Sequence, residues 1–113
     1  DKILSPFRDN KKPKKTVTSK DIEKIQKHIK KCWKTSYGFN ELKENVILKI
    51  SLSKNMDVVS VRVVDRNKYI NNSLYKAVAD SARRAVLDCS PLPLDNSYYA
   101  TLKEFEMEFY PNF

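Results

Sequence analysis

The stretch from Asp80 to Leu94 constrains the fold of this chain more than any other, because it joins an alanine-rich helical run to a proline-fixed exit. Three alanines at a spacing of three give the run a smooth side: Ala79, Ala82 and Ala85. Small side chains let a helix lie close to the surface that it covers. Pro91 and Pro93 then restrict the backbone that leaves the helix. The stretch predicts a helix packed closely on a sheet and held at a defined angle to the next strand.

Hydrophobic periodicity divides the rest of the chain into helices and strands. Apolar residues at spacings of three and four predict helices over residues 20–34 and 72–88. Alternation of apolar and polar residues predicts strands over residues 46–52, 58–64 and 102–110. In the second of these strands the side chains expected to face the core are Val59, Val61 and Val63.

This order of elements predicts an α+β fold. We expect a three-stranded antiparallel sheet in the order 2-1-3, with both helices packed on its one apolar face. A right-handed crossover through the second helix places the third strand beside the first. The folded domain should cover residues 18–113. Residues 1–17, rich in lysine and proline, are expected to form a flexible basic linker before it.

The net charge of +8 comes from the first part of the chain. Residues 1–43 contain 13 Lys or Arg and 5 Asp or Glu, whereas residues 44–113 contain 9 of each kind. This distribution favours a solvated basic segment attached to a neutral domain, and no nucleic-acid partner. A small nucleic-acid-binding domain that uses the lysines from Lys11 to Lys34 is the alternative.

The chemistry-bearing residues argue against an enzyme. The chain has one histidine, His28, and one glycine, so neither a histidine-based metal site nor a glycine-rich phosphate loop is expected. We predict no catalytic residues, no cofactor, no metal and no small-molecule substrate. Cys32 and Cys89 end the two predicted helices, and either a disulfide or a pair of reduced core thiols fits this placement. Trp33 is expected to fill the core at a helix end.

A three-stranded sheet leaves two edges, and an exposed edge is either protected or used for binding. We predict that an extended partner peptide adds to the third strand through main-chain hydrogen bonds, with the second strand as the alternative edge. The predicted partner-binding residues are Leu102, Lys103, Glu104, Phe105, Glu106, Met107, Glu108, Phe109 and Tyr110.

Several segments together resemble the C-terminal domain of the TolA family, within the TonB/TolA C-terminal superfamily. They are a helix ending in Cys-Trp, the Val-Ile-Leu-Lys-Ile-Ser-Leu hairpin strand, the Asp-Ser-Ala-Arg-Arg-Ala-Val and Ser-Pro-Leu-Pro-Leu strings, and the closing strand over residues 105–109. The resemblance covers roughly residues 19–111. It implies a periplasmic domain of the Tol-Pal cell-envelope system, carried by an inner-membrane protein whose anchor lies outside this segment.

The resemblance also implies partners. The domain would bind the N-terminal segment of TolB at a sheet edge and transmit inner-membrane energy to the outer membrane. Pal, colicins or phage coat proteins would be further partners, and TolQ and TolR would contact the N-terminal region outside this segment. A TonB-type energy transducer for outer-membrane transporters shares the fold and is the alternative that the resemblance leaves open.

Overall fold

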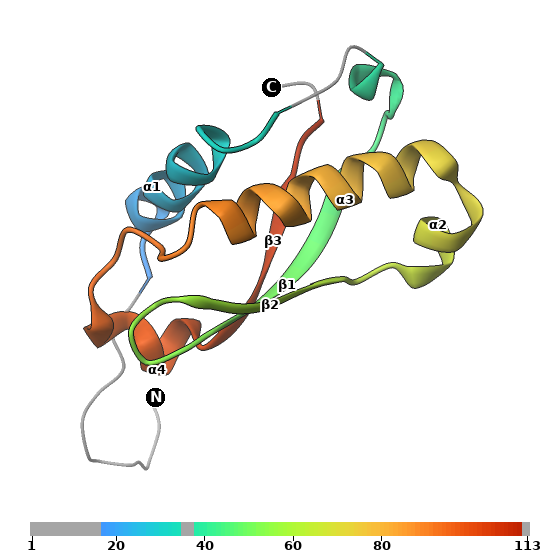
Figure 1. Ribbon diagram of the computed structural model, residues 1–113. Coiled ribbons are helices and arrows are strands. Elements are labelled where there is room, and N and C mark those ends of the chain that lie inside the picture. Colours follow the sequence, from blue (N-terminus) through green and yellow to red (C-terminus); the bar gives the residue numbers. More distant parts are fainter. Residues whose placement is uncertain (1–16, 35–37, 112–113) are drawn as a thin grey trace, which may run out of the picture.

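The computed structural model describes residues 17–34 and 38–111. Its elements, in chain order, are α1 (Ser19–Lys30), η1 (Phe39–Glu41), β1 (Val46–Leu52), β2 (Val58–Val63), α2 (Arg66–Asn71), α3 (Ser73–Asp88), η2 (Asn96–Tyr98), α4 (Tyr99–Leu102) and β3 (Glu104–Phe109). The strands form an antiparallel sheet in the order β2-β1-β3 (Figure 1), so the predicted α+β fold and strand order are confirmed. The predicted linker lies outside the described residues except for Val17.

The hydrophobic core lies against one face of the sheet. Alternate residues of the central strand are at most 5% exposed: Val46, Leu48, Ile50 and Leu52. α3 crosses this face, and α1 lies toward the β3 side of the sheet (Figure 1). Both helices contribute buried residues to the same core, as predicted. The opposite face of the sheet carries the polar residues of each strand.

α3 has the small-residue side that its sequence predicts. Ala79, Ala82 and Ala85 are at most 1% exposed, so the helix backbone lies close to the sheet. Asn72 caps the helix, because its side-chain oxygen accepts a hydrogen bond from the N–H of Tyr75 (3.1 Å).

A second, short helix lies just before α3, in a segment for which the sequence predicted neither a helix nor a strand. This is α2, whose cap is Asp65, the acceptor of the Lys68 N–H (3.0 Å). Its Tyr69 hydroxyl donates to Asp80 of α3 (2.7 Å), which joins the two helices.

α1 begins at a capping box and ends earlier than predicted. Thr18 Oγ1 accepts from the N–H of Asp21, and the Asp21 carboxylate accepts from the N–H of Thr18. The second of these bonds lowers the pKa of the Asp21 carboxyl. The predicted extension to Lys34 is wrong, since the helix ends at Lys30 and the chain then turns inward. Trp33, 7% exposed, packs in the core as expected.

Trp33 connects the end of α1 to α3 and to β3. Its indole Nε1–H donates to Ser81 Oγ (3.0 Å), and this hydroxyl donates to the carbonyl oxygen of Lys34 (2.9 Å). Its ring meets the ring of Phe109 edge to face at a centroid distance of 5.6 Å. The residues after α1 are therefore fixed by packing and not by continued helix.

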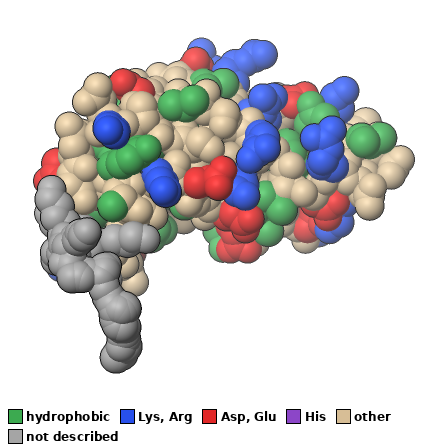
Figure 2. All heavy atoms as spheres, turned by 90° about the horizontal axis from the view of Figure 1, so that it is seen from below, with side chains coloured by type: hydrophobic (Ala, Val, Ile, Leu, Met, Phe, Trp, Pro, Cys, Tyr) green, Lys and Arg blue, Asp and Glu red, His purple; other side chains and the backbone are tan. Residues whose placement is uncertain are grey.

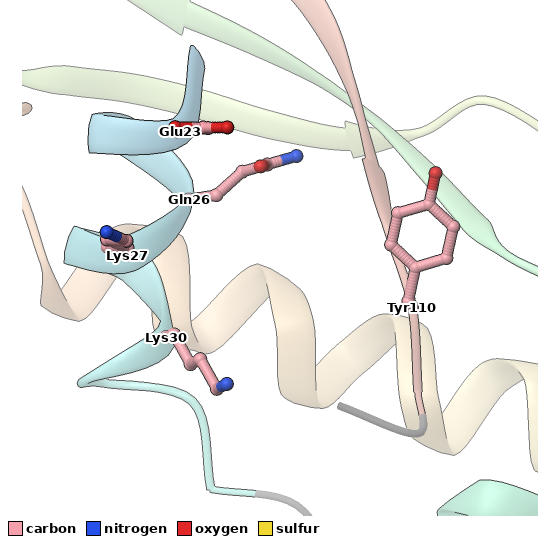
Figure 3. Close-up of a pocket in the computed structure, with 5 residues that line it drawn as sticks. All are labelled: Glu23, Gln26, Lys27, Lys30 and Tyr110. Atoms are coloured by element: carbon pink, nitrogen blue, oxygen red, sulfur yellow. The ribbon is translucent and has the colours of Figure 1, made fainter. Parts of the chain in front are cut away.

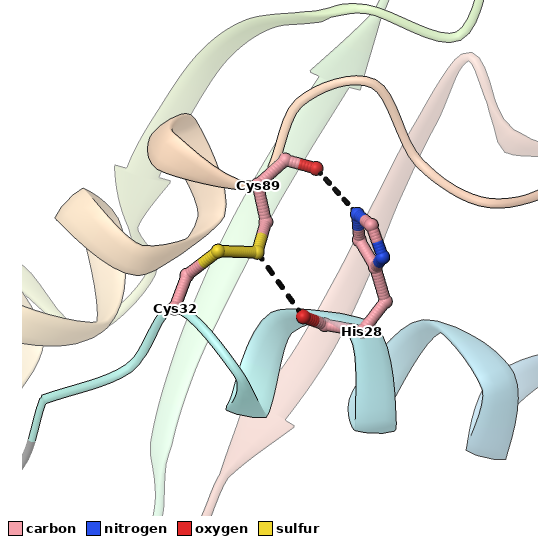
Figure 4. The surroundings of a disulfide bond; sticks show 3 residues. All are labelled: His28, Cys32 and Cys89. Carbon is pink, nitrogen blue, oxygen red and sulfur yellow. Dashed lines mark hydrogen bonds between the residues drawn. A yellow bond between two sulfur atoms is a disulfide. The ribbon is translucent and has the colours of Figure 1, made fainter.

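The two cysteines form a disulfide, which decides between the two alternatives that the sequence left open. Cys32 and Cys89 have Cα atoms 6.0 Å apart and join the C-terminal ends of α1 and α3 (Figure 4). His28 lies beside the bond and donates its Nε2–H to the carbonyl oxygen of Cys89 (2.7 Å), which can only accept. The Cys89 sulfur contacts the carbonyl oxygen of His28 at 3.1 Å. This histidine therefore connects two helices.

The β1–β2 hairpin contains a bulge that the sequence pattern did not reveal. The register shifts between Ser51 and Leu52, so that Leu52 faces Val58. The prediction that Val59 faces the core is wrong, because the bulge leaves this side chain 64% exposed and turns Val58 inward. Met56 adopts a left-handed backbone with φ of 69° and is buried beneath the turn.

β3 is shorter than predicted. The predicted strand began at Leu102 and ended at Tyr110, whereas the observed strand covers Glu104–Phe109. Leu102 ends the short helix α4 and is 4% exposed in the core. The exit from α3 contains a cis peptide bond between Ser90 and Pro91.

Candidate functional site at the free edge of the sheet

The hydrogen-bonding phase of the sheet determines which main-chain groups of β3 face away from β1. The N–H of Leu52 donates to the carbonyl oxygen of Lys103 (2.8 Å), and this pair continues the β1–β3 register. In an antiparallel ladder, opposed pairs alternate between hydrogen-bonded and non-hydrogen-bonded pairs. The residues of β3 whose N–H and C=O groups point toward β1 are therefore Phe105, Met107 and Phe109.

The main-chain groups of Glu104, Glu106 and Glu108 point the other way, to the free edge. Among residues 17–34 and 38–111, no hydrogen bond to these outward groups is found. An antiparallel or parallel strand needs such a row of donors and acceptors in order to add to a sheet. The edge of β3 therefore offers a template for one more strand.

The edge of β2, in contrast, is partly covered by groups from the C-terminal half of α3 and the loop after it. The contacts are Leu92 N–H to Met56 O (3.0 Å), Val58 N–H to Ser90 Oγ (2.8 Å) and Arg83 Nε to Val61 O (3.0 Å). These bonds satisfy main-chain groups that an added strand would need. The alternative binding edge considered from the sequence is thus partly closed, and β3 is the more open of the two.

The side chains of β3 divide by face as the alternation predicts. Met107 and Phe109 are at most 5% exposed and pack in the core, and Phe105 is half-buried against it. The three glutamates are exposed on the opposite face.

The three glutamates differ in their surroundings. Glu104 lies 3.8 Å from Lys49 Nζ and 3.6 Å from an Arg62 nitrogen, so cations already accompany it. Glu106 and Glu108 form no ion pair with any described residue. Tyr110 donates its hydroxyl to Glu108 (3.1 Å), and this bond raises the pKa of the phenol. Two adjacent outward carboxylates on β3 are therefore available to a cation.

A hollow lies between α1 and the end of β3 (Figure 3). Its volume is about 380 Å³, and the described residues that line it are Glu23, Gln26, Lys27, Lys30 and Tyr110. Figure 3 shows the four α1 side chains on one side and the Tyr110 ring on the other. The span from Glu23 to Lys30 is about 10 Å along the helix, close to the length of three extended residues. The hollow therefore lies beside the C-terminal end of β3.

The other parts of the described residues were searched for metal sites, membrane-spanning helices and areas of a single charge. In residues 17–34 and 38–111 no group of three or more His, Cys, Asp or Glu is arranged to hold a metal ion. None of the helices formed by these residues has the length and hydropathy needed to cross a membrane. Figure 2 shows Lys, Arg, Asp and Glu side chains interspersed over one face, with no broad area of a single sign.

The structure brings together most of the predicted binding residues and excludes one of them. Glu104 to Phe109 form the strand, and Tyr110 lines the hollow beside it. Leu102 is a core residue and cannot contact a partner at this edge. Lys103 is exposed just before the strand, with its carbonyl oxygen occupied by Leu52.

Sequence reasoning missed the contribution of α1 to this site and the groups that cover β2. In the sequence, the lysines of α1 indicated only positive charge. Their position beside Tyr110 depends on how the helix packs. Nothing in the sequence pattern indicated that Arg83 of α3 binds the carbonyl oxygen of Val61.

Comparison with known proteins identifies no relative. No family model matches the chain, and neither a curated protein nor a solved structure does. The functional assignment therefore rests on the geometry of the edge and on the residues themselves.

Proposed function

We propose that this domain is a non-catalytic adaptor that captures an extended peptide as a fourth strand on β3. One observation carries the proposal: the outward main-chain groups of Glu104, Glu106 and Glu108 lack partners in the described chain, while Val58 and Val61 at the β2 edge are bonded to Ser90 and Arg83. Main-chain hydrogen bonds would supply affinity along the strand. The hollow between α1 and Tyr110 would receive one of the peptide side chains.

We further propose that the domain acts in a cell envelope, as a TolA-like member of a Tol-Pal system. The residue strings that resemble TolA C-terminal domains support this assignment, and so does a helix–strand–strand–helix–strand core in the order β2-β1-β3. The Cys32–Cys89 disulfide suits an oxidising compartment such as the periplasm. The partner would then be the N-terminal segment of a TolB protein, and binding would transmit force from the inner to the outer membrane.

The decisive variant is Glu106→Pro. Proline removes the main-chain N–H of residue 106, which points to the free edge, and leaves the hydrogen bonds between β1 and β3 in place. The matched control is Glu106→Ala, which removes the same carboxylate but keeps the N–H. Isothermal titration with a peptide copying the N-terminal segment of TolB from the same genome should show binding to the wild type and to Glu106→Ala, and none to Glu106→Pro.

A second measurement covers the case in which Glu106→Pro does not fold. The wild-type chain is titrated with two further versions of the same peptide, one N-methylated at its odd-numbered residues and one at its even-numbered residues. These two versions are the two phases of methylation. One phase removes the donors that would face β3 and should abolish binding, whereas the other should bind as the parent does. If both phases bind equally, or if Glu106→Pro is folded and binds normally, strand addition at β3 is wrong.

The nucleic-acid alternative gives a different result in the same experiments. Binding of a single-stranded or duplex oligonucleotide would weaken steeply with salt and would be unaffected by Glu106→Pro. Tight oligonucleotide binding together with no peptide binding would replace the adaptor proposal by this alternative.

A further inference from the structure

We infer that the peptide accepted by β3 carries Lys or Arg at every second position, with uncharged side chains between them. This inference rests on the proposed function and names the chemistry of the partner. It comes from three features of the edge: the spacing of the glutamates, the lack of a cationic partner at Glu106 and Glu108 among the described residues, and the lysines on the other side of the hollow.

The first feature is geometric. Successive side chains of an extended strand point to opposite faces, so that residues two apart share a face about 7 Å apart. Glu104, Glu106 and Glu108 form such a series on the outer face of β3. A strand paired with β3 has its own side chains opposite these glutamates on the same face, at a separation that allows cross-strand contact. Its alternate positions therefore meet a row of carboxylates.

The second feature is charge. Glu104 already has Lys49 and Arg62 nearby, but Glu106 and Glu108 have no cationic partner among the described residues. Lys49 lies opposite Glu106 in the register and instead approaches Glu104. Opposite charges on directly opposed strand residues are favourable, and like charges are unfavourable. The outward positions of the peptide should be basic, above all those opposite Glu106 and Glu108.

The third feature sets the intervening positions. Side chains between the basic ones point to the core side, where α1 faces the end of β3 (Figure 3). The hollow there is lined by Lys27 and Lys30 together with Gln26, Glu23 and Tyr110. A basic side chain there would be placed beside Lys27 and Lys30, whereas an uncharged one would not be repelled by them. The pattern is thus basic and uncharged in alternation.

The test compares two synthetic peptides of identical composition and charge. One alternates lysine and threonine, and the other has its lysines in one block followed by its threonines. Affinity is measured for the full 113-residue chain by fluorescence anisotropy at low salt, and the binding site is mapped by amide chemical shifts. The alternating peptide should bind about tenfold more tightly, with shifts at Glu106 and Glu108, because two favourable cross-strand pairs are gained.

Two double variants distinguish the effect of the β3 glutamates from the effect of the overall charge of the domain. Glu106→Gln combined with Glu108→Gln should remove the preference for the alternating peptide. The control, Glu41→Gln combined with Asp88→Asn, lowers the negative charge by the same amount on exposed residues of η1 and α3 and should keep the preference. A threonine–valine peptide without charge tests strand addition by itself.

The outcomes distinguish the two proposals. If the threonine–valine and lysine peptides all shift β3 amides, but alternating and blocked peptides bind equally, the charge pattern is wrong and strand addition stands. If the preference survives in the double glutamine variant, the charge pattern is also wrong. If no peptide perturbs β3, the proposed function itself fails.

Discussion

Reduction of the Cys32–Cys89 disulfide should remove a large part of the stability of this domain. The bond closes a loop whose ends are separated by 57 residues. The loss of loop-closure entropy in the unfolded chain gives about 4 kcal/mol at 25 °C for a loop of this length. Domains of this size are commonly stable by about 5 to 15 kcal/mol, so the reduced form should be marginal.

The assay is urea unfolding followed by circular dichroism, with and without a phosphine reductant. For a denaturant slope of about 2 kcal/mol per molar, the midpoint should fall by about 2 M on reduction. The Cys32→Ala/Cys89→Ala variant serves as control, because its midpoint should lie near that of the reduced wild type and should not respond to the reductant. Hydrogen exchange adds a local readout, since α1 loses its covalent connection to α3 and should lose amide protection before β1 does.

Two results would refute this reasoning. Thiol titration of the unreduced, denatured chain could find two free cysteines, which would mean that the bond does not form. The midpoint of the oxidised protein could also equal that of the double alanine variant. In that case the packing of His28 and Trp33 would hold the end of α1 without help from the bond.

Three further predictions concern single contacts. Thr18→Ala removes the α1 cap and should cost about 1 kcal/mol in urea unfolding, whereas Thr18→Ser should cost little. The Tyr69 hydroxyl donates to Asp80, and this bond raises the pKa of the phenol, so the stability that it contributes is present below about pH 10 and is lost as the pH rises through the folded pKa. Thermal unfolding of Tyr69→Phe should show lower stability at pH 8 and a shallower alkaline decline, and an equal decline would contradict this. Arg83→Leu leaves the carbonyl of Val61 without its donor and should cost about 1 kcal/mol. It should also increase concentration-dependent association in analytical ultracentrifugation, and an unchanged monomer would show that other groups protect the β2 edge.

The order of the strands and the position of the core on one face of the sheet were predictable, because the hydrophobic patterns that indicate them are local and repeated. The alternation in β1 and β3 specified which residues would be buried, and the connections then limited the order of the strands. Predictions failed where a tertiary contact overrides a local pattern. The α1 pattern continues to Lys34, but the disulfide of Cys32 and the inward position of Trp33 end the helix at Lys30. The bulge at Val59 interrupts a valine series that looks regular in sequence.

The candidate site was predictable in part. The sequence identified β3 as an edge and favoured it over β2 for binding, but it contained no sign of the groups that cover part of the β2 edge. Those groups belong to Arg83 and Ser90, whose contacts with β2 exist only after α3 has crossed the sheet. The hollow beside Tyr110 likewise requires the packed position of α1.

The stretch from Asp80 to Leu94 therefore has a second effect beyond placing α3. Its Arg83 and Ser90 bind main-chain groups at the outer edge of β2, and Leu92 binds Met56 just before the strand, so the segment that positions the helix also closes part of that edge. β3 has no such cover in the described chain, and its three outward glutamates would repel the same strand of a second copy placed alongside. An edge built in this way resists pairing with itself and still accepts a strand that brings positive charge.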